Sequence, residues 1–321
     1  MAPVSPLELA QSNLLSPVVL AFAFGILAAR LRTDLTVPEG LMDAASLYLL
    51  LAIGLRGGVE LADSSLAELW LPALVTLSLG VVIPVVVFGA GRGPLRLDTD
   101  NASSLAAHYG SVSVVTFTAA VTLLEARSVD VAGFMTTLLA MLEVPGIVVA
   151  LVLARPHGGG GLGTAVRETL AGKSVMLLLG GLVIGALSGP ERFERATPVF
   201  VDAFYGVLVL FLLGLGLLVG RRLGDLRIAG RRLIAFGLVA PVAQGFLGTL
   251  LGAAAGLSTG SATVLGVMAA SASYIAAPAA VRVALPGASP ALSLVPALCI
   301  TFPFNLLVGI PLFYALARWI T

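Results

Sequence analysis

The sequence predicts an all-α integral membrane protein with ten transmembrane helices in two inverted five-helix repeats. Three observations support this fold class: the composition, the number of long apolar runs, and a likeness between the two halves of the chain. The residues are 58% hydrophobic and only 11% charged, whereas soluble domains average roughly 25% charged residues. Such a chain cannot cover a water-facing surface, and its apolar runs are much longer than the roughly 10-residue strands of a membrane barrel.

Ten apolar runs are candidates for spanning helices, because a helix needs about 20 mostly apolar residues to cross a bilayer. The stretch before the first run contains no Lys or Arg. We therefore interpret the first run as a retained helix rather than a cleavable leader. The ten runs lie near 15–31, 41–57, 67–90, 102–124, 131–154, 172–188, 199–220, 231–256, 261–283 and 290–320.

The basic residues of the short loops predict the topology, because cytoplasmic loops carry an excess of Lys and Arg. If the N-terminus lies outside, the inner loops hold 13 of the 18 basic residues and the outer side holds the other five. We therefore expect a multi-pass protein of the inner (plasma) membrane with both termini outside. The five outer residues are Arg56, Arg127, Arg192, Arg195 and Arg318.

The two halves of the chain contain similar stretches in the same order. For example, HYGSVSVVTFTAAVTLLE (108–125) matches MAASASYIAAPAAVRVAL (268–285), an offset of 160. Five helices per half is an odd number, so the second half enters the membrane inverted, which is typical of secondary transporters. We divide the chain into a first repeat (1–154), a cytoplasmic glycine-rich linker (155–173) and a second repeat (174–321).

Each of these matching stretches weakens its helix in the middle with small and hydroxylated residues. In transporters, paired interrupted helices break at the bilayer midplane and line the substrate cavity. The N-terminus of a half-helix favours a small anion. The alternative is close helix packing, which uses the same residue types, but two clusters in equivalent positions favour a site. The expected substrate-binding residues are Gly110, Ser111, Val112, Ser113, Ser271, Ala272, Ser273 and Tyr274.

Glu143 is an acidic residue inside an apolar run, two residues before Pro145. An ionisable group at that depth costs about 2.5–3.5 kcal/mol, so we expect it to face a partner or a cavity. The alternative is an interfacial acid at a helix break. Sodium prefers oxygen ligands, and the residues expected to bind or couple sodium are Thr116, Glu143, Thr301 and Asn305.

No motif for enzymatic chemistry is present. The chain has no Cys/His spacing for a transition metal, no phosphate-binding glycine loop and no nucleophile elbow. The net charge of +1 also argues against a nucleic-acid partner. We therefore expect a protein that is not an enzyme and has no cofactor, with sodium as its coupling ion.

Over nearly its whole length, the chain resembles the SbtA-type sodium-dependent bicarbonate permeases. The stretches that match are LSPVVLAFAFGILA, LTVPEGLMDAASLYLLLAIGLRGG, YGSVSVVTFTAAVTLLE, LEVPGIVVALV and AASASYIAAPAAVRVALPGASP. The resemblance implies a core domain that moves against a gate domain, a homotrimer, and sodium-coupled bicarbonate uptake at the two broken helices. For cyanobacterial members it also implies a small PII-like cytoplasmic regulator.

The second break departs from the family pattern, because Tyr274 stands where cyanobacterial members carry an aspartate. We therefore expect sodium-coupled uptake of bicarbonate or a similar small monoanion by alternating access. Two alternatives stay open: a transporter of another small carboxylate or solute on the same scaffold, and a membrane sensor that binds a ligand without moving it.

Overall fold

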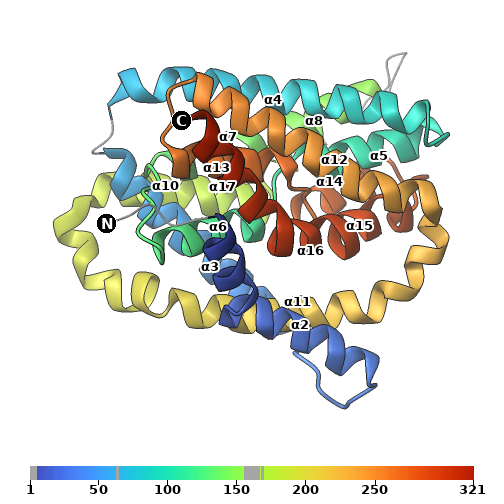
Figure 1. The fold of residues 1–321 in the computed structure, drawn as a ribbon, viewed down its shortest axis with the longest axis horizontal. Helices are drawn as coiled ribbons and strands as arrows, with labels where there is room; N and C mark the ends of the chain where they lie inside the picture. Colours follow the sequence, from blue (N-terminus) through green and yellow to red (C-terminus); the bar gives the residue numbers. More distant parts are fainter. Residues whose placement is uncertain (1–5, 63–64, 155–166, 168–169) are drawn as a thin grey trace.

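The computed structural model describes residues 6–62, 65–154, 167 and 170–321, and every regular element among them is helical (Figure 1). Most of the glycine-rich linker expected at 155–173 lies outside the described residues. The helices of the first half are α1 (Pro6–Leu14), α2 (Pro17–Arg30), α3 (Glu39–Ala62), α4 (Leu66–Arg92), α5 (Thr99–Gly110), α6 (Val114–Glu125), α7 (Met135–Glu143) and α8 (Pro145–Leu153).

The second half begins with α10 and repeats a similar order of long, broken and irregular helices. Two short turns, η1 (Glu194–Ala196) and η2 (Pro198–Asp202), follow α10, and η3 (Leu223–Asp225) follows α11. The remaining elements are α10 (Lys173–Phe193), α11 (Phe204–Arg222), α12 (Leu226–Ala254), α13 (Thr259–Ala270), α14 (Ala276–Ala284), α15 (Pro290–Pro296), η4 (Ala297–Thr301), α16 (Phe302–Phe304), η5 (Asn305–Gly309) and α17 (Ile310–Ile320).

The lengths and composition of these helices confirm a membrane protein of the helical type. Among the described residues, seven helical segments are long and apolar enough to cross a membrane, or eight if the bent pair α1–α2 forms one span. This number counts Pro198–Ala254, which holds both α11 and α12, as one segment, and it excludes α13 because of its length. The ten crossings expected from the sequence remain a prediction.

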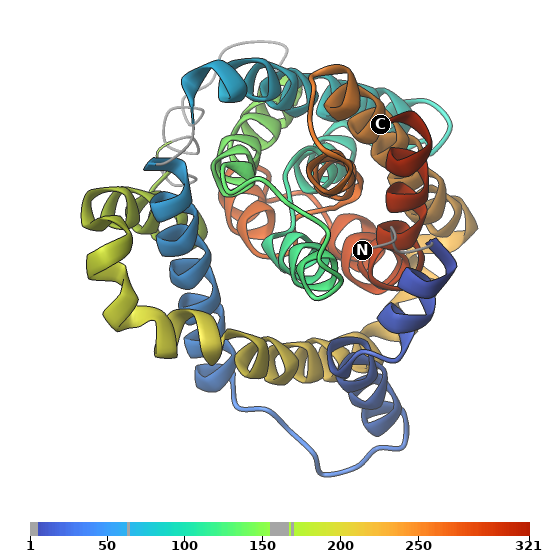
Figure 2. The same cartoon turned by 60° about the vertical axis from the view of Figure 1, so that its left-hand side comes forward.

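Four long helices form a bent layer around two sides of the other helices (Figure 2), which we call the four-helix layer: α2, α3, α10 and α11. Within it α3 packs along α10 and α2 packs along α11. Glycines allow these close approaches: a Cβ on Gly54 would lie 2.7 Å from the Leu178 carbonyl oxygen, and one on Gly181 would lie 2.8 Å from the Gly54 Cα. Such small-residue contacts are typical of helix pairs in membranes.

The other helices form a central bundle, which the four-helix layer borders on two sides in Figure 2. The span Thr99–Glu125, which contains α5 and α6, is 89% buried inside the protein, whereas the span Lys173–Ala196 is only 33% buried. The broken helix pair α5/α6 therefore occupies the interior of the bundle, and α10 exposes an apolar face outward. This arrangement places the first predicted break deep inside the protein.

Candidate functional site

Both predicted helix breaks are present, and each begins with a serine in an extended conformation. Helix α5 ends at Ser111 (φ −102°, ψ 166°), and α13 ends at Ser271 (φ −81°, ψ 168°). The next helices then begin at Val114 and Ala276. Serine side chains stabilise such ends because they offer hydrogen bonds to backbone groups that a helix terminus leaves unsatisfied.

Two hydrogen bonds donated by backbone N–H groups connect the first broken helix with the second. The Ser113 N–H donates to the Ser271 Oγ (2.8 Å), and the Ser273 N–H donates to the His108 carbonyl oxygen (2.7 Å). Ser113 also caps α6, because its Oγ accepts from the Thr116 N–H at 3.2 Å. In α14 the Ser273 Oγ accepts from the Ala277 N–H at 3.1 Å. These hydrogen bonds hold the two broken helices against each other.

The carbonyl ends of the preceding half-helices are covered in two ways. The Asn305 Nδ2 donates to the Ala270 carbonyl oxygen at the end of α13 (2.8 Å). At the end of α5, the Gly110 carbonyl oxygen lies directly against the Cα of Gly146 in α8, where any side chain would collide with it. In both halves of the chain, therefore, a residue of the last membrane segment contacts the C-terminal end of the broken helix.

A small cavity lies between these helix starts, lined by Val112, Ser113, Val114, Glu143, Ser174, Ser273, Tyr274, Ile275 and Ala276. Its volume is about 10 Å³, which leaves room for about one water molecule. Ser174 belongs to α10, so the cavity lies where the four-helix layer meets the central bundle. We call it the inner cavity.

Glu143 brings an acidic side chain to the inner cavity. It is the last residue of α7 and is 1% exposed. Its carbonyl oxygen accepts from the Ser111 Oγ (2.9 Å), which fixes its position, whereas its buried Oε2 has no hydrogen-bond partner among the residues that the structure describes. A buried ionised carboxylate is costly unless a cation or several donors compensate it. Glu143 is therefore arranged to receive either a cation or a proton.

Tyr274 presents its hydroxyl group to the same cavity. Its ring packs edge-on against Phe302, with the ring centroids 5.4 Å apart. The hydroxyl lies near the Ser113 side chain without completing a hydrogen bond. A buried phenol normally finds a partner, so this hydroxyl is available to donate to a ligand that enters the cavity.

The structure brings five of the twelve predicted site residues to the inner cavity: Val112, Ser113, Glu143, Ser273 and Tyr274. Four others, Gly110, Ser111, Ser271 and Ala272, lie in the breaks and do not line it. Thr116 lies in the first turn of α6, where its Oγ1 donates to the Ser113 Oγ (2.9 Å).

The last two predicted residues lie on the final span and away from the cavity lining. The Thr301 Oγ1 donates to the Gly237 carbonyl oxygen (2.8 Å) and lies 2.7 Å from the Tyr109 hydroxyl, so it connects α5 with α12. Asn305 keeps its Oδ1 buried without a partner. Asn305 therefore still offers an oxygen to a cation next to the second break, and Thr301 does not reach the inner cavity.

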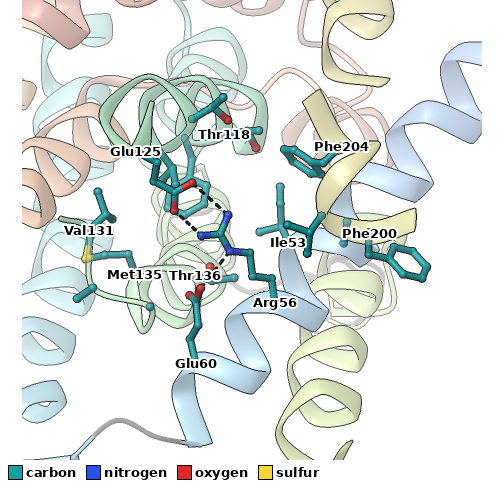
Figure 3. A pocket seen from close by; sticks show the side chains of 17 residues that line it. Ile53, Arg56, Glu60, Thr118, Glu125, Val131, Met135, Thr136, Phe200 and Phe204 are labelled. Atoms are coloured by element: carbon teal, nitrogen blue, oxygen red, sulfur yellow. Dashed lines mark hydrogen bonds and ion pairs between the residues drawn. The ribbon is translucent and has the colours of Figure 1, made fainter. Parts of the chain in front are cut away.

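Ser174 was not among the predicted site residues, and Arg56 was predicted only to lie on the outer side. Ser174 follows the linker and carries no periodic signal that distinguishes it. Arg56, by contrast, lies within the apolar helix α3, and an arginine at such a position is a signal for a functional site. It lines a second cavity together with Glu60 and Glu125 (Figure 3), which we call the outer cavity.

A series of cavities follows α6 between the four-helix layer and the bundle. The inner cavity shares Val114 and Ile275 with a neighbouring cavity of about 10 Å³. That cavity in turn shares Thr118 with the outer cavity. The three cavities therefore mark one line from the helix breaks to Arg56.

Comparison with known proteins gives one family. The sequence profile described as the Na+-dependent bicarbonate transporter superfamily matches residues 17–318. No curated protein matches the chain. The family is one of transporters, in agreement with the expectation that the chain is not an enzyme.

Proposed function

Because the chain belongs to the Na+-dependent bicarbonate transporter superfamily, we propose that it is a secondary active transporter for bicarbonate or a similar small monoanion, coupled to sodium. One observation carries the proposal for the site: the crossed breaks bring Ser113, Tyr274 and Glu143 around one buried cavity. Half-helix N-termini attract an anion, and the Ser113 and Tyr274 hydroxyls can donate to it. The substrate site lies at this crossing.

Charge explains why a cation must accompany the anion. An anion next to an ionised Glu143 would be repelled, so a sodium ion on the Glu143 carboxylate, the one predicted sodium ligand that lines the cavity, makes the site favourable for both. Entry of one anion into a negative-inside cell costs about 2.3 kcal/mol per 100 mV. One sodium ion cancels that charge, and its concentration gradient drives uptake.

Movement between the four-helix layer and the central bundle would complete the transport cycle. The inner cavity has room for about one water molecule,, so the conformation described is closed around the site. Ten crossings in two inverted repeats, with the ends of the chain outside, fit this mechanism, because the two repeats can exchange conformations. A homotrimer and a PII-like regulator remain predictions from the resemblance alone.

The test is uptake of labelled bicarbonate by the purified protein in liposomes, with and without an inward sodium gradient. We expect accumulation that depends on sodium and stops in the variant Ser273→Leu, which fills the inner cavity. The matched control is Ser78→Leu, at an exposed position of α4, which should transport normally.

A panel of formate, acetate and nitrate as competitors defines the range of monoanions. Uptake of labelled formate or acetate without uptake of bicarbonate would indicate another small carboxylate as substrate. Saturable binding without uptake of any anion, in folded protein, would contradict the transporter proposal and favour a sensor.

A further inference from the structure

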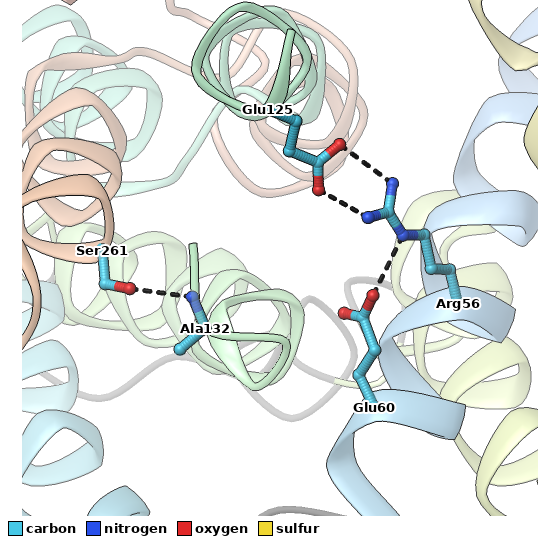
Figure 4. Close-up of polar contacts among 5 residues, drawn as sticks. All are labelled: Arg56, Glu60, Glu125, Ala132 and Ser261. Atoms are coloured by element: carbon cyan, nitrogen blue, oxygen red, sulfur yellow. Dashed lines mark hydrogen bonds and ion pairs between the residues drawn. The ribbon is translucent and has the colours of Figure 1, made fainter. Parts of the chain in front are cut away.

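Arg56 links the four-helix layer to the central bundle. Its guanidinium donates through Nη1 and Nη2 to the two carboxylate oxygens of Glu125 on α6, the first at 3.1 Å (Figure 4). Its Nε donates to the Glu60 Oε1 at 3.0 Å, one helical turn away on α3. Glu125 therefore occupies the open fork of the guanidinium, and Glu60 fixes the orientation of that fork.

The outer cavity next to this ion pair has room for a ligand. It measures about 70 Å³ by the same definition that gives about 10 Å³ for the inner cavity. At about 10–15 Å³ per water molecule, it holds several waters or one small anion. The side chains of Arg56 and Glu125 remain 42% and 35% exposed. The protein itself therefore leaves Arg56 open to an approaching anion.

The cavity wall is firmly held on the bundle side. The Ala132 N–H, just before α7, donates to the Ser261 Oγ of α13 at 2.9 Å (Figure 4). Gly133 contacts the Glu60 side chain so closely that no larger residue fits there. The outer cavity is thus a shaped pocket between ordered elements and not a gap at a loose surface.

The second repeat has no equivalent of this cluster. At the offset of 160 that relates the two breaks, Arg56, Glu60 and Glu125 correspond to Gly216, Gly220 and Leu285. Gly216 and Gly220 serve close packing against α2. The cluster therefore serves only one of the two sides, the one that the basic residues predict to be outside.

We propose that Arg56 is a capture site for the substrate anion, where the anion takes the place of the Glu125 carboxylate before it moves along α6 to the helix breaks. This inference rests on the proposed function. Bicarbonate and short carboxylates present the same planar pair of oxygens as Glu125, and a guanidinium binds that shape through two parallel hydrogen bonds. A spherical anion such as chloride offers no pair of oxygens and cannot form two parallel hydrogen bonds with the guanidinium.

The exchange also connects capture with movement. When the anion displaces Glu125, the contact between α3 and α6 is released, while Glu60 still holds Arg56 in place. Glu125 ends α6, and Ala126 after it is exposed, so the released carboxylate turns into solvent. Binding of the correct anion thus frees the bundle from the layer at the outer side.

The test compares variants that the proposal affects in opposite directions. Glu125→Gln removes the competitor, and we expect the KM for bicarbonate uptake to fall about threefold or more. Arg56→Gln removes the fork, and KM should rise about tenfold. Arg56→Lys keeps the charge without the fork and should also raise KM severalfold. The control is Arg127→Gln, which removes a nearby arginine that donates to Ser12 and should leave KM unchanged.

A second readout does not depend on transport. We would measure the unfolding temperature of each purified variant against bicarbonate, formate and chloride concentration, since a ligand that binds the folded state raises it by mass action. The concentration of bicarbonate or formate that produces a given rise in the unfolding temperature, which we call the half-effective concentration, should fall in Glu125→Gln and rise in Arg56→Gln. Chloride should have no effect. The baseline stability of a variant does not enter this comparison.

The results separate the capture site from the proposed function. If wild-type protein transports bicarbonate but Arg56→Gln changes neither KM nor the half-effective concentration, the capture site is wrong and the transporter proposal stands. If both charge variants shift in the same direction, the ion pair is merely structural. If no variant transports, the unfolding measurements still decide whether Arg56 binds the anion.

Discussion

At the scale of single residues, Tyr274 combines a packing role with an unused polar group. Its ring contacts Phe302, while its hydroxyl faces the inner cavity without a completed hydrogen bond. An unsatisfied buried hydroxyl costs about 1–3 kcal/mol. A protein keeps such a group when the group is needed for binding.

The variant Tyr274→Phe separates these two roles. Removal of the unsatisfied hydroxyl should leave the unfolding temperature unchanged or slightly raised, because the ring contact stays. Loss of a donor to the substrate should raise the KM for bicarbonate about tenfold or more, as expected for one lost hydrogen bond to a charged group. Thermal unfolding measures the change in stability, and liposome uptake measures the change in KM. An unchanged KM would show that the phenol only fills space.

Residues of the site differ in how far the sequence could predict them. Ser113 and Ser273 were predictable, because hydroxyl groups that interrupt two apolar runs at equivalent positions are a local pattern. The grouping of Thr301 with Glu143 was not predictable. Thr301 contacts Gly237 and Tyr109 because of the way the last span is rotated, and no local sequence pattern fixes that rotation. Ser174 joins the cavity only because α10 docks there, which is a property of tertiary packing.

At the scale of elements, the last spans of the two repeats are joined to the broken helices by different chemistry. In the second repeat Asn305 donates to the end of α13, within a span that contains the π-helical turns η4 and η5. The Leu306 carbonyl oxygen in η5 accepts from Asn13 of α1. Pro303 lies in α16, between these two turns, but the sequence could not show which side chain would reach the carbonyl end of α13.

In the first repeat the corresponding contact depends on a glycine, which gives a prediction for the element. The variant Gly146→Ala places a methyl group against the Gly110 carbonyl oxygen, and both partners are backbone, so α8 must move away from α5. Overpacking of this kind costs about 1–3 kcal/mol or more. We expect a lower unfolding temperature and reduced uptake, because the break at Ser111 moves with α5.

Gly89→Ala is the matched control for this prediction. Gly89 lies within α4, and a Cβ there meets no neighbouring atom within 4 Å. Alanine is also a better helix former than glycine by about 1 kcal/mol. The control should be as stable as the wild type or slightly more so. Equal unfolding temperatures for the two variants would argue against a tight contact between α5 and α8.

At the scale of the whole molecule, the two sequence repeats do not correspond to two separate bodies. The four-helix layer takes α2 and α3 from the first half and α10 and α11 from the second, and the bundle likewise combines both halves. The sequence predicted apolar helices, and the likeness of the two halves predicted which stretches of one half correspond to which of the other. It could not predict which helices would form the layer, because glycines of the same helices also lie elsewhere: Gly57 of α3 faces Thr136 of α7, and Gly180 of α10 meets no described neighbour within 4 Å.

This division predicts which cross-links stop transport. In a Cys299→Ala background, which removes the single cysteine, Arg56→Cys with Glu125→Cys places one thiol on the layer and one on the bundle. A short reducible bis-thiosulfonate reagent should then block uptake at saturating bicarbonate, and reduction should restore it. Uptake is compared before and after cross-linking in the same sample, so the loss of Arg56 affects both measurements equally.

The matched control joins two helices within the layer. Lys173 and Asp43 form an ion pair at 2.9 Å between α10 and α3, so Asp43→Cys with Lys173→Cys accepts the same reagent without linking layer to bundle. If the layer moves as one unit against the bundle, uptake continues in this variant after cross-linking. Uptake that survives the cross-link between α3 and α6, confirmed by mass spectrometry, would contradict movement between the two bodies. Block by both cross-links would instead place the movement inside the layer, between α3 and α10.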